Sequence, residues 1–150
     1  MSLIIMFDLE NTLIDSWNSG CVLFKKVSFI KTKIKELTKD TQDDIIFGVF
    51  SFACDLPSDK PKAIKNAEFA TGFSIDSNFV VSWNELENLC EFRTDSLQKW
   101  EIVNLFGKHG MFDMWTREFP DHSFILFDDA LPDKFNKMIR DNQTIIKVRV

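Results

Sequence analysis

Strand-like and helix-like segments alternate along this chain, and this alternation constrains the fold more than any other feature of the sequence. Five short, mostly apolar runs have the length and composition of β-strands. The first, second and fourth runs contain almost no polar residue, which is typical of strands covered on both faces in a parallel sheet. The five runs are Leu3–Phe7, Ile45–Phe50, Phe79–Trp83, Ser123–Phe127 and Thr144–Val150.

The segments between these runs carry apolar residues three or four positions apart, which is the spacing of an amphipathic helix. The resulting order of strands and helices predicts a three-layer α/β/α domain with a mostly parallel five-stranded sheet. The last run alternates apolar and polar residues, so we expect it at an edge of the sheet with one face in water. The predicted helices are Val22–Leu37, Lys60–Phe69, Ser96–Lys108 and Pro132–Asp141.

The composition fits a single globular domain over residues 1–150. Hydrophobic residues make up 45% and charged residues 27% of the chain, a balance that allows a chain of this length to bury a sizeable core. The net charge of −5 argues against a protein dedicated to coating nucleic acid, because contacts to phosphate need Lys and Arg. A local basic patch remains compatible with that charge.

The cysteines and the start of the chain indicate where the protein resides. Cys21, Cys54 and Cys90 are far apart and odd in number, and no C-x-x-C pair occurs. We expect buried thiols in a reducing compartment rather than a disulfide framework or a zinc site. No secretory signal and no run of 18 apolar residues is visible, so we expect a cytoplasmic protein without a membrane segment.

Polar side chains follow three of the strand-like runs at the point where each run ends. Asp8 and Glu10 follow the first run, Ser51 follows the second, and Asp128 and Asp129 follow the fourth. Because the carboxyl ends of parallel strands meet at one edge of a sheet, we expect these groups to converge there. Several carboxylates in one crevice repel each other unless a cation lies among them, and hard oxygen ligands suit Mg²⁺.

Two of these segments resemble sequence motifs of the haloacid dehalogenase superfamily. "MFDLENTLID" is similar to the first motif, an apolar strand followed by Asp, any residue, Asp, any residue, and Thr or Val. "ILFDDALPD" is similar to the fourth, an acidic pair after a strand with a further Asp, here Asp133, four residues on. Ser51 fits the second motif and Lys99 the third, with Lys108 as an alternative to Lys99. The resemblance spans almost the whole chain and implies a Rossmann-like core.

The resemblance assigns a catalytic role to several residues. Asp8 would be the nucleophile that forms an aspartyl-phosphate. Glu10 stands in the place of the acid/base, which protonates the leaving oxygen and then activates water. Ser51 and Lys99 would hold the phosphoryl oxygens, and Thr12 belongs to the same phosphate-binding set. These roles imply a Mg²⁺-dependent phosphomonoesterase.

The resemblance also implies a set of metal ligands. Asp8, the backbone carbonyl of Glu10, and Asp128 or Asp129 would bind Mg²⁺, and Asp133 would support them. The metal would neutralise charge and align the phosphate with the nucleophile.

One substitution departs from the family pattern, because Glu10 stands where the family has Asp. The extra methylene moves the carboxylate by about one C–C bond, and a misplacement of about 1 Å can cost about 100-fold in rate. A phosphatase and a catalytically degenerate protein that binds phosphate or a partner therefore both remain open. The apolar stretch 107–119 would support the second alternative if it formed an exposed patch, but it would equally serve to cover the sheet.

The spacing of the motifs leaves no room for a large cap domain, so the chain resembles the small, capless magnesium-dependent phosphatases. An open site favours a large phosphorylated substrate, such as a phosphoprotein or a nucleic-acid end, although a small phosphate ester also fits. A protein partner or a second copy of the chain would be able to cover the site. Lys31, Lys35 and Lys39 share one helical face and would either guide a polyanion toward the site or form a solvated surface.

Two further observations bear on the function. A response-regulator-like receiver would need a phospho-acceptor Asp after the third strand, and "VVSWNE" at that place contains none.

His109 and His122 have no partner at the spacing of a metal site or a catalytic triad, so we expect both in loops or on the surface.

Overall fold

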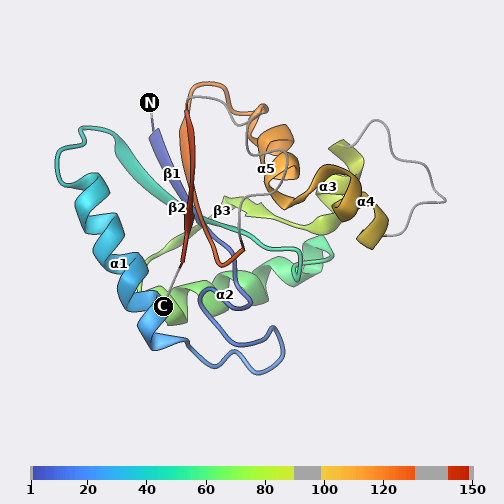
Figure 1. The fold of residues 1–150 in the computed structure, drawn as a ribbon, viewed down its shortest axis with the longest axis horizontal. Coiled ribbons are helices and arrows are strands. Elements are labelled where there is room, and N and C mark those ends of the chain that lie inside the picture. Colours follow the sequence, from blue (N-terminus) through green and yellow to red (C-terminus); the bar gives the residue numbers. More distant parts are fainter. Residues whose placement is uncertain (1, 90–98, 131–141, 149–150) are drawn as a thin grey trace.

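The computed structural model describes residues 2–89, 99–130 and 142–148. Within these residues, five parallel strands form one sheet in the order β3-β2-β1-β4-β5 (Figure 1). This confirms the expected fold class, and the sheet is parallel throughout rather than mostly parallel. The strands are β1 (Ser2–Phe7), β2 (Asp44–Phe50), β3 (Ile75–Val81), β4 (Ser123–Asp128) and β5 (Gln143–Lys147).

Strand β1 occupies the centre of the sheet because both of its faces are apolar. Its residues Ile4, Ile5, Met6 and Phe7 are fully buried. Since successive side chains of a strand point to opposite faces, Ile5 and Phe7 join one hydrophobic core and Ile4 and Met6 join the other. The alternating final strand, β5, lies at an edge of the sheet, as its sequence predicts.

Helices α1 (Phe24–Thr38) and α2 (Lys60–Thr71) cover one face of the sheet (Figure 1). Helix α1 buries Val27, Ile30 and Ile34, whose spacing of three and four residues places them on one side of the helix. Helix α2 contributes Ala63 and Ala67 to the same core. The predicted helices 22–37 and 60–69 are thus confirmed, and a short 3₁₀ turn, Pro57–Asp59, precedes α2.

The opposite face of the sheet is covered by α3 (Trp83–Leu89), α4 (Lys99–Phe106) and α5 (Lys108–Thr116). Met111, Phe112 and Trp115 of α5 are buried in this second core. The apolar stretch 107–119 therefore covers the sheet, and the alternative of an exposed patch is wrong for these three residues. Sheet and helices together form three layers.

A glycine divides the segment that we expected to be one helix over residues 96–108. Helix α4 ends at Phe106, and α5 begins at Lys108. Gly107 between them has φ of 72° and ψ of 156°, a backbone conformation that is open essentially only to glycine and that interrupts the helix. The break makes Lys108 the first residue of a new helix, which the helical spacing alone did not predict.

Some other expectations need correction, and some lie outside the described residues. Trp83 begins α3 rather than ending β3. Cys21 is exposed, so only Cys54 of the two described cysteines is the buried thiol we expected. The predicted helix 132–141, with Asp133, and also Cys90 lie outside the described residues.

The third strand approaches the second unusually closely at Gly48. A Cβ atom at this position would lie 2.3 Å from the Phe79 carbonyl oxygen and 2.8 Å from the Phe79 Cβ. The pairing of β2 with β3 also shifts register between Phe47 and Val49. Glycine within a strand is expected where another backbone comes this near.

Across the residues that the structure describes, no helix is both long enough and apolar enough to cross a membrane.

Candidate active site

The candidate site lies where the chain reverses the direction in which it adds strands to the sheet. Strands β2 and β3 extend the sheet on one side of β1, and β4 and β5 extend it on the other. Phe7 of β1 pairs with Phe127 of β4, so Asp8, which follows β1, and Asp128, the last residue of β4, lie level at the same edge. The Asp8 amide donates a hydrogen bond to the Phe127 carbonyl at 3.0 Å. Ligands bind at such switch points in open α/β sheets.

Three carboxylates meet at this edge. Asp8, Asp128 and Asp129 each offer an oxygen within 4.8 Å of the others. Asp8 and Asp128 are buried, at 6% and 1% exposure. The structure therefore brings together the three side chains predicted to bind metal, and the fourth predicted ligand, the backbone carbonyl of Glu10, stays a prediction.

The Thr12 hydroxyl links two of these carboxylates. It lies 3.1 Å from Asp8 Oδ2 and 3.3 Å from Asp129 Oδ1, and the residue is fully buried. A hydroxyl carries one proton, so it donates to one carboxylate at a time. Thr12 reaches this position because the chain turns sharply after β1, with Asn11 at φ of 63° and the Thr12 amide bonded to the Leu9 carbonyl at 3.1 Å.

Lys108, the first residue of α5, supplies the positive charge at the site. Its Nζ lies 2.7 Å from Asp8 Oδ1 and 3.3 Å from Asp128 Oδ2. Burial alone would lower the pKa of Lys108, but the charges of Asp8 and Asp128 outweigh burial and raise the pKa above its usual value. The ammonium group therefore stays protonated at neutral pH and offsets part of the carboxylate charge.

His109 is a buried neighbour of the site, which corrects our expectation of a loop or surface residue. It is 1% exposed, and its Nε2 lies 3.2 Å from Asp128 Oδ2. The other oxygen, Oδ1, accepts a bond from the Ala130 amide at 3.2 Å. Asp128 is thereby held from both sides, and this fixes its orientation. His122 is half-buried in a turn, in agreement with the expectation.

The two buried aspartates titrate in opposite directions. Burial, together with the charges of Asp128 and Asp129, raises the pKa of Asp8 to about 7 even though Lys108 opposes the shift. Burial would also raise the pKa of Asp128, but the hydrogen bond from His109 and the charge of Lys108 outweigh it and hold the pKa well below its usual range. Without a further cation, Asp128 is thus firmly ionised, and Asp8 retains its proton to a higher pH than a free aspartate does.

Ser51 is buried in the loop that follows β2. Its Oγ accepts a hydrogen bond from the Ala53 amide at 3.3 Å. Because Val49 pairs with Phe7, Ser51 follows its strand at the same sheet edge as Asp8.

Lys99 is anchored to the loop after β2. Its Nζ donates a hydrogen bond to the Phe52 carbonyl at 2.6 Å, lies 3.6 Å from Asp55 Oδ1, and sits over the Trp83 ring at 5.1 Å. Lys108, which we considered as the alternative to Lys99, is the lysine that contacts Asp8. Phe52 lies between the two, since its ring also faces Lys108 Nζ at 5.5 Å.

Glu10 directs its carboxylate to the loop beyond the strand. Its Oε2 accepts a hydrogen bond from the Trp17 amide at 2.8 Å. The Trp17 ring in turn lies 4.7 Å from Lys62 Nζ on α2. The longer side chain thus ties the segment after β1 to a loop that rests on α2, and the carboxylate is not one of the three that cluster.

Sequence reasoning missed His109 and placed Lys108 second to Lys99. Gly107 is the sequence signal that could have identified Lys108 and His109, because glycine often marks the end of one helix, and the residues after it then form the first turn of the next. Comparison with known proteins adds no further assignment: no family model, no curated protein and no solved structure matches this chain.

Proposed function

We propose that this protein is a Mg²⁺-dependent phosphomonoesterase of the haloacid dehalogenase type. The observation that carries the proposal is the cluster of Asp8, Asp128 and Asp129 at the carboxyl edge of a parallel sheet, with the ammonium group of Lys108 paired to the first two. Such a site offers a nucleophile, metal ligands and a cation for phosphate, which are the three requirements of phosphoryl transfer.

The donor set fits magnesium. Three carboxylate oxygens within 4.8 Å of one another are hard ligands, and Mg²⁺ is commonly held by one or two carboxylates together with water and phosphate oxygens. One ammonium group does not balance three carboxylates, so a divalent cation would complete the neutralisation. When bound, the metal would polarise the phosphoryl group and align it with the nucleophile.

Asp8 is the proposed nucleophile. One of its carboxylate oxygens forms a bond to phosphorus while the bond from phosphorus to the ester oxygen breaks. Lys108 at 2.7 Å and the Thr12 hydroxyl at 3.1 Å hold the two oxygens of Asp8 in place. Lys108 Nζ, already beside Asp8, would stabilise the negative charge on the phosphoryl oxygens in the transition state, while the electron pair of the broken bond leaves on the ester oxygen.

Glu10 is the proposed acid and base. In this role it gives a proton to the leaving ester oxygen, and afterwards it takes a proton from the water that hydrolyses the aspartyl-phosphate. Oε2 accepts the hydrogen bond from the Trp17 amide, so in this role the proton is carried by Oε1, or by Oε2 once the side chain rotates away from that amide.

A direct test uses an aryl phosphate as substrate. Wild-type protein should release the phenol with Mg²⁺ and lose activity in a chelator, and Asp8→Asn should abolish turnover because the amide is no nucleophile. Asp44→Asn is the matched control. Asp44 is exposed and is the first residue of β2, so it lies at the end of the strands opposite to the site. Turnover that survives in Asp8→Asn, or no turnover in the wild type, would refute the proposal.

The hydrogen bond of Glu10 to Trp17 favours a second candidate, a degenerate member that binds phosphate without hydrolysing it. In that case the longer side chain serves the loop and leaves the site without an acid. Glu10→Asp separates the two candidates. A large gain in aryl phosphate hydrolysis would show that the natural protein is catalytically detuned, whereas a loss would show that the site is built around glutamate.

A further inference from the structure

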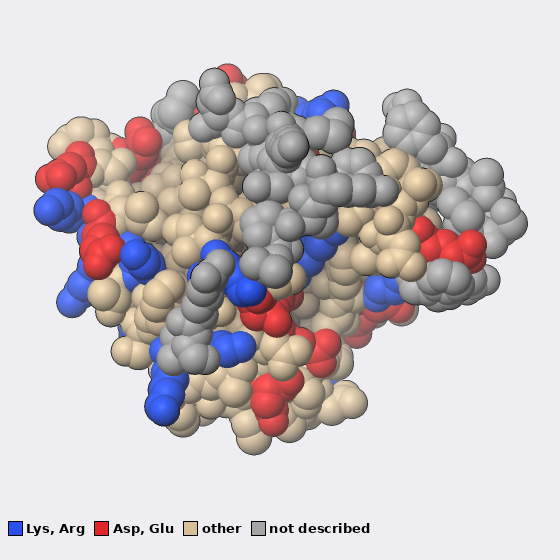
Figure 2. Space-filling model, in the orientation of Figure 1, with Lys and Arg blue, Asp and Glu red and all other residues tan. Residues whose placement is uncertain are grey.

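Helices α1 and α2 concentrate positive charge in a chain that is acidic overall. Helix α1 contains five lysines and one glutamate, α2 contains three lysines and one glutamate, and the whole chain has a net charge of −5. Figure 2 shows blue side chains over α1, with red ones beside them near its C-terminal end. The layer on one side of the sheet is therefore basic, and the rest of the chain carries the acidic excess.

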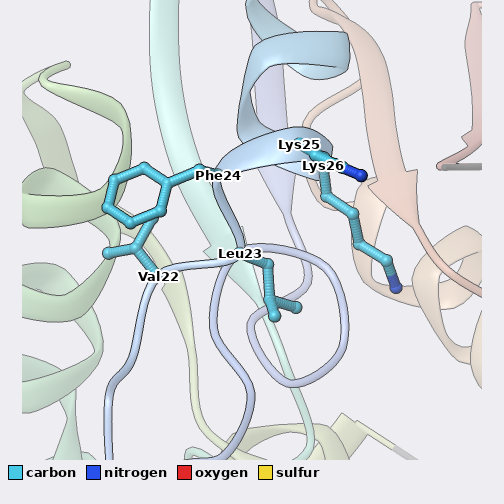
Figure 3. A pocket seen from close by; sticks show the side chains of 5 residues that line it. All are labelled: Val22, Leu23, Phe24, Lys25 and Lys26. Carbon is cyan, nitrogen blue, oxygen red and sulfur yellow. The ribbon is translucent and has the colours of Figure 1, made fainter.

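Two aromatic rings stand exposed on this basic layer. Phe24, the first residue of α1, and Phe69 of α2 are each 79% exposed. In Figure 3 the Phe24 ring lies over Val22, and Lys25 and Lys26 extend to the other side. A single exposed phenylalanine needs no explanation, but the Phe24 ring lines the same pockets as several lysines, and a ring beside lysines suits planar, negatively charged ligands.

Two open pockets meet at Phe24. One, of about 340 Å³, is lined by residues 22–26. The other, of about 440 Å³, extends along α1 and reaches Ala70 of α2, with Lys31 and Lys35 in its wall. Among the described residues, no acidic side chain lines either pocket. We call these two pockets together the Phe24 groove.

The Phe24 groove begins beside the candidate active site. Lys26 Nζ donates a hydrogen bond to the carbonyl of Asn11, and Asn11 precedes Thr12, whose hydroxyl contacts Asp8. Leu23 is also bonded to the same loop, through its amide and the Leu13 carbonyl at 2.9 Å. A chain-like ligand lying in the groove would therefore have its end close to the nucleophile.

We propose that the Phe24 groove binds single-stranded nucleic acid and presents its phosphorylated end to Asp8. This inference rests on the proposed phosphatase function and names its substrate class. Lysines four residues apart follow a repeating backbone charge, and an exposed ring stacks on any base, so the surface would bind without sequence preference. An acidic peptide would satisfy the lysines but would leave the Phe24 ring without a planar partner.

Binding is tested with a short fluorescein-labelled oligothymidylate that carries no terminal phosphate, so that the result does not depend on catalysis. The double variant Lys31→Gln/Lys35→Gln should weaken binding by about tenfold or more and reduce the slope of log K against log salt by about 1.4, at about 0.7 per lost contact to a single strand. Phe24→Ala should weaken binding by about fivefold or more through lost stacking.

The matched control is Lys33→Gln/Lys65→Gln, which removes the same charge from α1 and α2 at two lysines that lie outside the groove lining and outside the row of Lys31 and Lys35. Lys33 lies over the Phe29 ring at 5.8 Å much as Lys31 lies over Phe73 at 5.7 Å, so both doubles lose one comparable ring contact, and the control also loses the exposed ion pair of Lys33 with Glu36 at 3.5 Å. The control double should change binding less than twofold. Thermal melts of both doubles check that they remain folded.

The catalytic readout compares two substrates. The groove double should lower kcat/KM for a 3′- or 5′-phosphorylated oligothymidylate by about tenfold and leave hydrolysis of the aryl phosphate unchanged. The inference is overturned if the oligothymidylate does not bind, if the control double weakens binding equally, or if polyglutamate displaces the probe as well as unlabelled oligonucleotide does. Groove-dependent binding without aryl phosphate hydrolysis would instead refute the phosphatase function and support the groove.

Discussion

Lys108 Nζ lies 2.7 Å from Asp8 Oδ1, and this ion pair joins the first turn of α5 to the end of the central strand. The same ammonium group reaches Asp128 Oδ2 at 3.3 Å. A helix from one outer layer thus supplies the cation that allows two neighbouring strands to end in buried carboxylates, because a buried charge without a partner is costly.

Replacing Lys108 should affect phosphoryl transfer more than replacing Lys99. Lys108→Met should lower kcat for aryl phosphate hydrolysis by about 100-fold or more, because it removes the cation that stabilises the phosphoryl charge. Lys99→Met should have a small effect, since Lys99 is engaged with the Phe52 carbonyl and Asp55. Steady-state kinetics of both variants measure these effects. An equal loss of kcat in the two variants would indicate that Lys99 also takes part in catalysis.

The Asp8→Asn variant should become progressively more stable than the wild type as the pH rises, when no divalent ion is present. The pKa of Asp8 is raised from 3.8 to about 7 in the fold, chiefly by burial, so the folded state holds this proton more tightly than the unfolded chain does. That contribution to stability is complete below about pH 4 and is lost as the pH rises to about 7. The asparagine does not titrate.

Thermal melts of wild type and Asp8→Asn in a chelator, taken between pH 4 and pH 8, would measure this difference. A constant difference in melting temperature across that range would contradict the predicted titration. Asp44→Asn again provides the control, because its side chain is exposed at the far end of β2.

His109 should act on magnesium binding through Asp128 rather than on the phosphate. His109→Phe should weaken the apparent Mg²⁺ affinity by about 10- to 100-fold, because Asp128 Oδ2 loses the hydrogen bond that orients it. His109→Gln retains a donor and should recover part of that affinity. Activity titrated against Mg²⁺ measures the effect, and a loss of kcat at saturating Mg²⁺ with unchanged affinity would argue against this role.

Gly48→Ala should destabilise the protein by about 1–3 kcal/mol. The new methyl group would lie 2.3 Å from the Phe79 carbonyl oxygen, so β2 and β3 must move apart. Urea unfolding followed by fluorescence of the four tryptophans gives the change in the free energy of unfolding. Unchanged stability would mean that the two strands separate there without cost.

The sheet and the acidic edge could be predicted from the sequence because local signals determine them. Apolar runs without polar interruption gave β1, β2 and β4 their places inside the sheet, and parallel pairing then brought Asp8 and Asp128 together. Lys108 and His109 depend instead on the direction in which α5 leaves Gly107. Helical spacing does not encode that direction, since the second core fixes it through contacts between residues far apart in the chain.

Glu10 shows a different limit of sequence reasoning. Its position in the motif suggested a side chain directed at the phosphate, but its length allows it to reach the Trp17 amide. The partner of a flexible carboxylate depends on which loop packs nearby, and the residues after Glu10 gave no periodic pattern from which to predict that loop.

The separation of the two hydrophobic cores has an evolutionary consequence. Lys108 enters the site from the layer of α5, whereas Lys26 touches the site loop from the layer of α1. In the proposed phosphatase, mutations that remodel the α1 layer would alter how a ligand reaches the site while the α5 layer keeps Lys108 in place, so substrate preference and reactivity would be free to diverge at different speeds.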